Sequence, residues 1–345
     1  MTVVSYVSGH GLGHASRSVE VVAELLQQRA DLRIVIRTSA RRSVFERIQD
    51  DRVVVERCET DTGVVQIDSL RLDIEDTARR AAAFYRDFDR RVADEASHLR
   101  RCGATVVIAD VPPLAIAAAR REGLPSVVVA NFTWDWIYAY YPEFEPLAPG
   151  VIRTIADAYS NVTLALRLPL PGGFDSMAGV IRDIPFIARR STRDRAEMRR
   201  VLGIDGTRTA VLSSFGGYGV DLPYARVEES GLMVLAPEAP PHGLKYEDIV
   251  AAVDVVVSKP GYGIVSECIA NGTPFLYTSR GRFAEYDVMR AEMPRMLRCR
   301  HITQDDLLAG RWREDVDALL AQDALPNRQR VDGAAVAARA ILDTQ

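Results

Sequence analysis

Short apolar segments alternate with longer amphipathic segments along almost the whole chain. In the first half, β-branched runs at residues 3–7, 33–37, 105–109 and 126–130 are separated by stretches with helical periodicity. Strands that alternate with helices of ten or more residues form parallel βαβ units. Because the apolar runs are nearly continuous, their strands should be buried on both faces of a sheet. The pattern therefore predicts an α/β fold built on doubly wound, parallel sheets.

This alternation of strands and helices is interrupted once and then starts again. Residues 168–190 are rich in Pro and Gly and have no helical period, whereas strand-like runs return at 209–213 and 254–258. A chain of 345 residues is also too long for one ordinary core. We expect two Rossmann-like domains facing a cleft, with the Ala-rich stretch 331–342 as a last helix that packs on either domain. The expected parts are a first domain at 1–168, a connection at 169–190 and a second domain at 191–345.

The composition argues against several classes of protein. The 43 basic and 47 acidic residues are interspersed and leave a net charge of −4, which offers no face for nucleic acid. No run of 18 apolar residues occurs, so we expect no stable membrane insertion. The four cysteines form no C-x-x-C pair and the N-terminus has no secretory pattern. These features favour reduced thiols in a cytoplasmic protein that has no structural zinc site.

The loop after the first strand, residues 8–14, reads S-G-H-G-L-G-H. A glycine-rich turn between a strand and a helix exposes backbone N–H groups at the sheet edge where open α/β folds bind ligands. The G-x-G-x-G spacing differs from the dinucleotide fingerprint G-x-G-x-x-G, and Arg37 rather than an acidic residue ends the second strand. Both departures argue against a nicotinamide enzyme.

Two of the five histidines, His10 and His14, lie in this loop. Imidazole titrates near neutral pH, so His14 is a candidate general base for an acceptor hydroxyl. Asp110 ends another strand and should emerge at the same edge, where it could orient His14. The structural alternatives are that His14 hydrogen-bonds the loop and that Asp110 caps the next helix. His10 either contacts the acceptor or phosphate, or only shapes the turn.

A second glycine-rich turn, S-K-P-G-Y-G at residues 258–263, also follows a strand and opens a helix. Only two of the 43 basic residues are lysines, so Lys259 in this turn suggests a compact charge for a diphosphate. Glu267, one turn into the helix, could accept hydrogen bonds from a ribose or could simply favour the helix dipole. The turn glycines and those of a third cluster could donate backbone N–H groups to the donor. The candidate donor-binding residues here are Gly216, Gly217, Lys259, Gly261, Tyr262, Gly263 and Glu267.

Six aromatic side chains fall within residues 132–141. Aromatic faces suit stacking on a sugar or planar acceptor, and Asp135 could add hydrogen bonds. Trp134 and Asp135 are therefore candidate acceptor-binding residues. The alternative is that this stretch packs in the core between the domains.

Several sequence blocks together resemble the GT-B glycosyltransferases, such as the UDP-glucuronosyl and MurG-like enzymes. They resemble even more closely the glycosyltransferase-like domain at the N-terminus of plant L-arabinokinases. The resemblance extends over nearly the whole chain, and no Walker-type loop that would imply sugar phosphorylation accompanies it. The blocks are SGHGLGHASR (8–17), TGVVQIDSL (62–70), NFTWDWIYA (131–139), RLP (167–169), FGG (215–217) and KPGYGIVSE (259–267).

The resemblance implies a role for individual positions. His14 matches the general base of GT-B enzymes, and Asp110 falls where the plant-type transferases keep its partner. Lys259 aligns with their diphosphate-binding histidine and Glu267 with their ribose-binding glutamate. Glu285–Tyr286 aligns with the Asp-Gln pair that holds the donor sugar, so Glu285 is a candidate sugar-binding residue. The tyrosine in place of glutamine leaves the identity of the donor open.

These expectations combine into an inverting, metal-independent glycosyltransferase of GT-B fold. Its partners would be a nucleoside diphosphate sugar, as co-substrate with no other cofactor, and a small-molecule acceptor. Two alternatives stay open from the sequence. One is a nucleotide-sugar epimerase or hydrolase on the same fold, and the other is a non-catalytic nucleotide-sugar-binding regulatory module.

Overall fold

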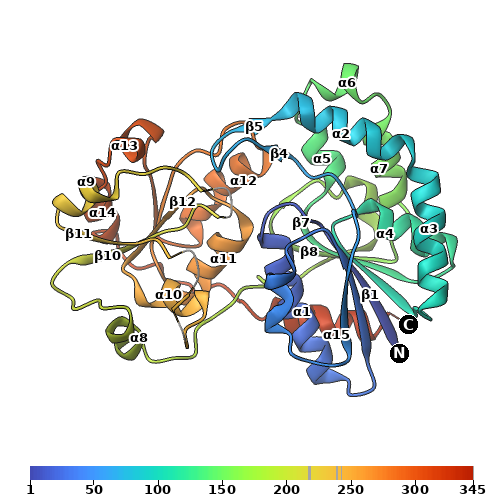
Figure 1. The fold of residues 1–345 in the computed structure, drawn as a ribbon, viewed down its shortest axis with the longest axis horizontal. Coiled ribbons are helices and arrows are strands. Elements are labelled where there is room, and N and C mark those ends of the chain that lie inside the picture. The colour runs from blue at the N-terminus through green and yellow to red at the C-terminus, as the bar shows by residue number, and fades with distance from the viewer. Residues whose placement is uncertain (217–218, 238–239, 242, 345) are drawn as a thin grey trace.

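The computed structural model describes residues 1–216, 219–237, 240–241 and 243–344, which form two α/β halves side by side (Figure 1). The first half is built on a seven-stranded parallel sheet in the order β3-β2-β1-β6-β7-β8-β9. Its strands are β1 (Thr2–Val7), β2 (Arg33–Thr38), β3 (Val53–Arg57), β6 (Val106–Asp110), β7 (Ser126–Phe132), β8 (Leu164–Gly172) and β9 (Ile181–Asp183). The predicted doubly wound α/β architecture is confirmed.

Helices cover both faces of this sheet because successive side chains of each strand point to opposite sides. On β1, Val3 and Val7 pack toward α1, whereas Val4 and Tyr6 pack toward α4, and all four are fully buried. The helices of this half are α1 (Gly13–Gln28), α2 (Ile74–Arg86), α3 (Phe88–Arg101), α4 (Pro113–Arg121), α5 (Trp134–Ala139), α6 (Phe144–Leu147) and α7 (Val151–Tyr159), with short 3₁₀ turns η1 (Arg42–Arg47) and η2 (Asp175–Val180).

The second half is built on a five-stranded parallel sheet in the order β11-β10-β12-β13-β14. Its strands are β10 (Thr209–Ser213), β11 (Leu232–Leu235), β12 (Val255–Ser258), β13 (Phe275–Tyr277) and β14 (Cys299–His301). Its helices are α8 (Arg195–Val201), α9 (Tyr224–Glu229), α10 (Tyr246–Ala252), α11 (Tyr262–Asn271), α12 (Ala284–Glu292), α13 (Gln304–Leu308) and α14 (Arg313–Leu320), with the 3₁₀ turn η3 (Met293–Arg295).

The first sheet extends into the stretch that we expected to be the connection. β8 runs to Gly172 and β9 to Asp183, so the chain leaves this sheet later than residue 168. Pro169 and Pro171 fall where the ladder between β7 and β8 is irregular, between the pairs Ala130–Arg167 and Phe132–Gly172. Proline has no N–H to donate to a ladder, so an interrupted stretch tolerates it.

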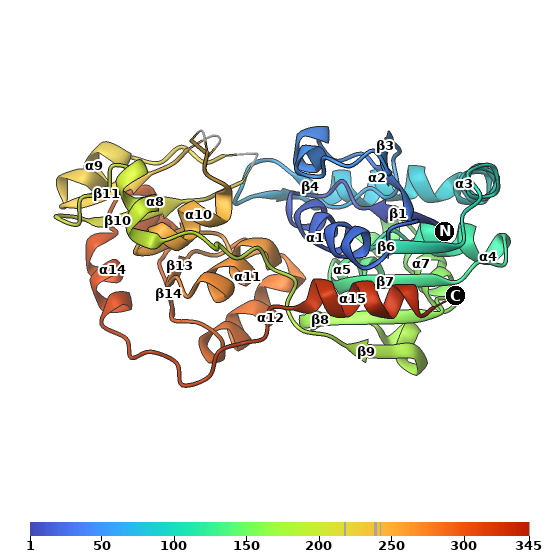
Figure 2. The same cartoon turned by 90° about the horizontal axis from the view of Figure 1, so that it is seen from below.

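The last helix, α15 (Gly333–Leu342), returns to the first half and packs on α1 (Figure 2). Its residues Ala337 and Ile341 are fully buried in the same cluster as Val19 and Val22. The chain thus crosses between the halves twice. Within the described residues, no helix combines the length and apolar character needed to span a bilayer.

A hairpin of the first half also reaches the second half. β4 (Val65–Gln66) and β5 (Leu72–Asp73) pair antiparallel, and we call residues 65–73 the strap. Leu70 is buried in the core of the second half, and Ser69 Oγ donates a 2.6 Å hydrogen bond to the carbonyl of Phe215. Figure 1 shows β4 and β5 between the two halves. The strap therefore joins the halves at one side of the space between them.

Candidate active site

The two halves enclose a cleft of about 1600 Å³. The glycine-rich turns of the two halves meet there, because a Cβ atom on Gly263 would lie only 3.4 Å from the Cα of Gly13. Glycine at both positions allows the N-termini of α1 and α11 to approach each other closely. Helix N-termini carry partial positive charge and unpaired N–H groups. The cleft is thus suited to an anionic ligand.

Most of the residues predicted for the site line this cleft. They are His10, His14, Gly216, Lys259, Gly261, Tyr262, Gly263, Glu267 and Glu285. Asp110 lies behind His14, and Gly217 falls outside the described residues. The structure brings the two predicted turns together, while Trp134 and Asp135 do not line the cleft.

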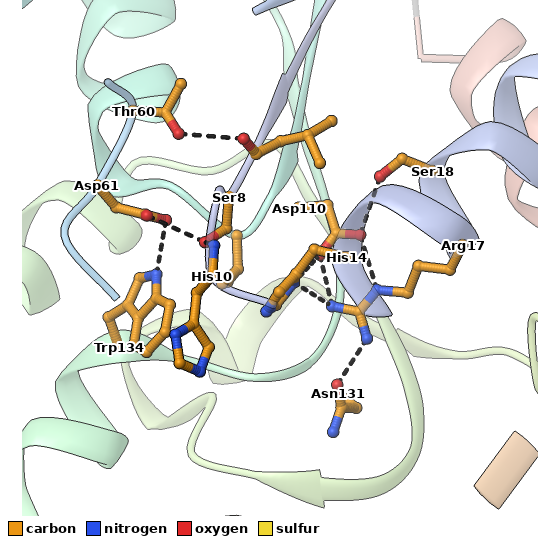
Figure 3. A network of polar contacts seen from close by, with 12 residues as sticks. Ser8, His10, His14, Arg17, Ser18, Thr60, Asp61, Asp110, Asn131 and Trp134 are labelled. Atoms are coloured by element: carbon orange, nitrogen blue, oxygen red, sulfur yellow. Dashed lines mark hydrogen bonds and ion pairs between the residues drawn. The ribbon is translucent and has the colours of Figure 1, made fainter. Parts of the chain in front are cut away.

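His14 is held at the start of α1 by a buried network (Figure 3). Its Nδ1 atom lies 2.8 Å from Oδ1 of Asp110, and Nη2 of Arg17 lies 3.0 Å from the same nitrogen. Arg17 binds both carboxylate oxygens of Asp110, its Nε at 2.7 Å from Oδ2. When Nδ1 carries the proton and donates it to Asp110, Nε2 is left as the basic nitrogen of His14.

Asp110 remains ionised in spite of being 2% exposed. Burial on its own raises the pKa of this carboxyl, but the charge of Arg17 and then that of His14 outweigh it and hold the pKa at about 2. Ser18 Oγ also donates to Oδ2 of Asp110 at 3.0 Å. The carboxylate is thus a fixed acceptor for the Nδ1 proton of His14.

His10 is a neutral donor beside this network. The backbone N–H of Val64 donates to its Nδ1 at 3.2 Å, so the ring proton resides on Nε2, which is buried and has no partner within the described part of the chain. Burial and the nearby charge of Arg280 lower the pKa of His10 well below its usual value. The ring stacks with Phe283 of the second half at 6.2 Å between centroids. An unpaired buried donor that faces a ligand cleft is available to a ligand acceptor.

Lys259 is held in the cleft at an energetic cost. Its Nζ donates to Oε1 of Gln66 in the strap at 3.2 Å. Burial, followed by the charge of Arg280, lowers the pKa of Lys259 to about 7. The folded protein thus binds fewer protons here than the unfolded chain between about pH 7 and 10.

We expect Lys259→Met to raise the melting temperature of the ligand-free protein by several degrees at pH 6. A lysine whose pKa falls on folding destabilises the fold most at low pH, and this cost fades as pH rises from about 7 toward its unfolded value. The difference between variant and wild type should therefore shrink between pH 7 and 10. Calorimetric melts across that range measure it, and an equal difference at every pH would show that Lys259 titrates as in water.

The two predicted carboxylates of the donor site are paired with arginines of the same chain. Glu267 accepts from Arg189 at 2.6 Å, and burial raises the pKa of Glu267 although Arg189 opposes this shift. Glu285 accepts from Arg280 at 2.9 Å and from Nδ2 of Asn131 at 2.8 Å. A ligand hydroxyl must therefore share or displace these partners to reach either carboxylate.

Known proteins resemble this chain in sequence and in fold. No known protein-family model matches the chain. The chain is 34% identical over 334 residues to L-arabinokinase of Arabidopsis thaliana. The aligned region covers 89% of this chain and 31% of the plant protein. The resemblance to that protein is confirmed, while the chain spans only about a third of the length of the kinase.

Solved structures match almost the whole chain. The kitacinnamycin glycotransferase superposes with a TM-score of 0.61 at 17% identity, over 98% of this chain and 95% of that one. A ugt transferase of Siraitia grosvenorii in complex with UDP (TM-score 0.59, 12% identity) and MurG of Acinetobacter baumannii (0.54, 11%) each cover 99% of both chains. The chain has the GT-B fold. The expectation of two Rossmann-like domains about a cleft is confirmed with it.

Two residues predicted for the acceptor do not line the cleft, although the Trp134 ring lies against His10 at 5.6 Å between centroids. Trp134 is fully buried, and its Nε1 donates to Oδ2 of Asp61 at 2.9 Å. Asp135 accepts from Ser176 Oγ at 3.1 Å, away from the cleft. The aromatic stretch contributes to the core of the first half, so the alternative of core packing describes Trp134 and we assign neither residue to the acceptor.

Four residues of the network carried no recognised signal in the sequence. Arg17 and Asp61 lie beside His14, whereas Gln66 and Arg280 lie beside Lys259. Burial raises the pKa of Asp61 to about 6, although hydrogen bonds from Trp134 and Ser8 favour its ionised form. Arg17 alone could have been found, because residues three apart on a helix share a face with His14.

Proposed function

We propose that this chain transfers a sugar from a nucleoside diphosphate sugar to a hydroxyl group of a small-molecule acceptor. The transfer would invert the anomeric carbon and would use neither a metal ion nor a further cofactor. The observation that carries the proposal is the His14–Asp110 pair, 2.8 Å apart, at a cleft whose other side is the Lys259 turn of α11. A base and an anion-binding turn across one cleft suit a direct displacement.

In the proposed reaction, Nε2 of His14 takes the proton of the acceptor hydroxyl. The acceptor oxygen then forms a bond to the anomeric carbon while the bond from that carbon to the diphosphate oxygen breaks. The diphosphate leaves with the electron pair. Asp110 holds the Nδ1 proton of His14 and stabilises the imidazolium that forms. Positive groups of the second half stabilise the charge on the leaving diphosphate.

The second half would bind the donor. Lys259 and the backbone of Gly261 and Gly263 would contact the diphosphate, and Glu267 and Glu285 would bind ribose and sugar hydroxyls. Support comes from the solved structure of similar fold that contains UDP. The strongest geometric support is the open glycine backbone at the N-terminus of the ten-residue helix α11.

A second candidate is a nucleotide-sugar-binding module without turnover. The observation that favours it is that Glu267 and Glu285 are each paired with an arginine of the chain itself. Of the three residues predicted for the acceptor, His10 lines the cleft but Trp134 and Asp135 do not, which leaves the acceptor side less defined. This candidate predicts tight donor binding with no release of nucleoside diphosphate.

A ligand panel tests the proposal. UDP-, dTDP- and GDP-sugars are added to the purified chain, and the melting temperature and then nucleoside diphosphate release are measured. At a ligand concentration 100 times the Kd, binding stabilises the folded state by about 2.7 kcal/mol, a shift of several degrees. Stabilisation with acceptor-dependent release supports a transferase. Stabilisation without release under any acceptor supports the binding module, and no stabilisation by any nucleotide contradicts both.

A further inference from the structure

Two cationic side chains lie close together at the glycine-rich turn of the second half. Lys259 belongs to the turn itself, and Arg280 follows β13 and is only 8% exposed. A Cβ atom built on Gly261 would lie 3.8 Å from Nη1 of Arg280, and both cations line the cleft. Both positive groups therefore border the bare backbone where α11 begins.

The hydrogen-bonding capacity of these cations is only partly used. Nη1 of Arg280 donates to Glu285, but its Nε is buried and has no hydrogen-bond partner among the residues that the structure describes. The charge of Arg280 is one cause of the low pKa of Lys259, so each cation makes the other more costly to keep. Buried donors and like charges without a full complement of acceptors are typical of a site that a ligand completes.

The strap supplies a third group to the same corner. Gln66 lines the cleft, and its Oε1 accepts from Nζ of Lys259 at 3.2 Å. Its amide group also carries two N–H donors. Gln66 belongs to the sequence block TGVVQIDSL, to which the proposed reaction gives no role. The strap is fixed on the second half through Ser69 and Leu70, so Gln66 is held near Lys259.

The ligand that fits this corner is an anion with more than one charge and several acceptor oxygens. Two cations, an amide and the N-terminal N–H groups of α11 match the oxygens of a diphosphate. Glu285 accepts from Arg280 and also from Asn131, and the carboxylate of Asp68 in the strap offsets part of the positive charge at Lys259.

We propose that Arg280 and Gln66 complete, with Lys259, a composite site for the diphosphate of the donor. The inference rests on the proposed function for the identity of the ligand. When Arg280 turns to a phosphate oxygen, Oε2 of Glu285 becomes free to accept a sugar hydroxyl. Donor binding would then prepare the sugar subsite, and both halves of the chain would contribute to the donor site.

The test measures binding of inorganic pyrophosphate and of UDP to the full chain by titration calorimetry, in metal-free buffer at pH 7. We expect Arg280→Gln to weaken the binding of both ligands at least tenfold. Arg280→Lys, which keeps the charge, should recover part of that loss. Gln66→Glu should also weaken binding at least tenfold, because it places a negative charge against Lys259. The matched control is Arg282→Gln, since Arg282 is 57% exposed and pairs with Glu143 on the surface.

The outcomes are separable. If Arg280→Gln melts like the wild type and binds pyrophosphate and UDP within twofold of it, Arg280 is only a partner of Glu285 and the inference is wrong. If the wild type binds neither probe, the composite site is equally wrong. If pyrophosphate binding depends on Arg280 and Gln66 but no nucleotide sugar is turned over, the site stands and the proposed transferase fails.

Discussion

Replacing His14 with alanine is expected to lower the rate of sugar transfer by about 10²–10⁴-fold and to leave UDP binding unchanged. The imidazole lies at the start of α1, and its Nδ1 is 2.8 Å from Oδ1 of Asp110. The groups proposed to bind the donor lie mainly on the second half, so the affinity for UDP should not depend on this ring. Steady-state kinetics and calorimetric UDP binding on the same preparation measure the two effects.

A matched control for this variant is His301→Ala. His301 is exposed on β14 and lies outside the cleft lining, so its loss should change neither rate nor binding. If His14→Ala transfers sugar within threefold of the wild type, His14 is not the base. Asp61, the other titratable carboxyl of the network, with its pKa at about 6, would then be the next residue to replace.

Replacing Arg17 with methionine is expected to destabilise the fold by about 3–5 kcal/mol. Arg17 is 4% exposed and provides the main charge that keeps Asp110 ionised. The variant leaves a buried carboxylate without its cation, which costs more than the pair itself contributes. Urea unfolding at pH 7 measures the loss. Asp110→Asn in the same chain should return part of it by removing the uncompensated charge.

The pH dependence of the free energy of unfolding gives a second measure of the Arg17–Asp110 pair. The pKa of Asp110 falls on folding, so its contribution to stability is present above about pH 4 and is lost as pH falls toward 2. Arg17→Met should remove this part of the acid dependence. Arg153→Met is the control, because Arg153 is 89% exposed and its ion pair should contribute less than about 1 kcal/mol. A loss of under 1 kcal/mol for Arg17→Met would contradict the central role of the pair.

Arg17 also limits how strongly Asp110 can activate His14. In the resting state the guanidinium and the carboxylate neutralise each other, and His14 adds a positive charge only when it accepts a proton. Nη2 of Arg17 lies 3.0 Å from Nδ1, so the imidazolium would form beside an existing cation. Asp110 thus acts mainly to fix the ring and its Nδ1 proton. Arg17 continues through Nη1 to Asn131, which reaches Glu285, so the proposed base and the proposed donor side share one network.

The sequence alone determined the fold and the location of the site. The alternation of strands and helices is a local property, and buried parallel strands require continuous apolar runs whatever the rest of the chain does. The proximity of His14 and Asp110 followed for a similar reason. Both come at the carboxyl ends of neighbouring parallel strands, which meet at one edge of a sheet.

Only the tertiary structure decided which side chains face the cleft and which partners they have. Trp134 stands next to the end of β7, but α5 begins there and turns the ring into the core toward Asp61. Gln66 meets Lys259 across 193 positions of sequence, and Asn131 meets Glu285 across 154 positions. Periodicity fixes which face of an element is buried, whereas contacts between distant loops depend on how the halves dock. The donor and acceptor details of this site therefore emerge only after both halves and the strap are in place.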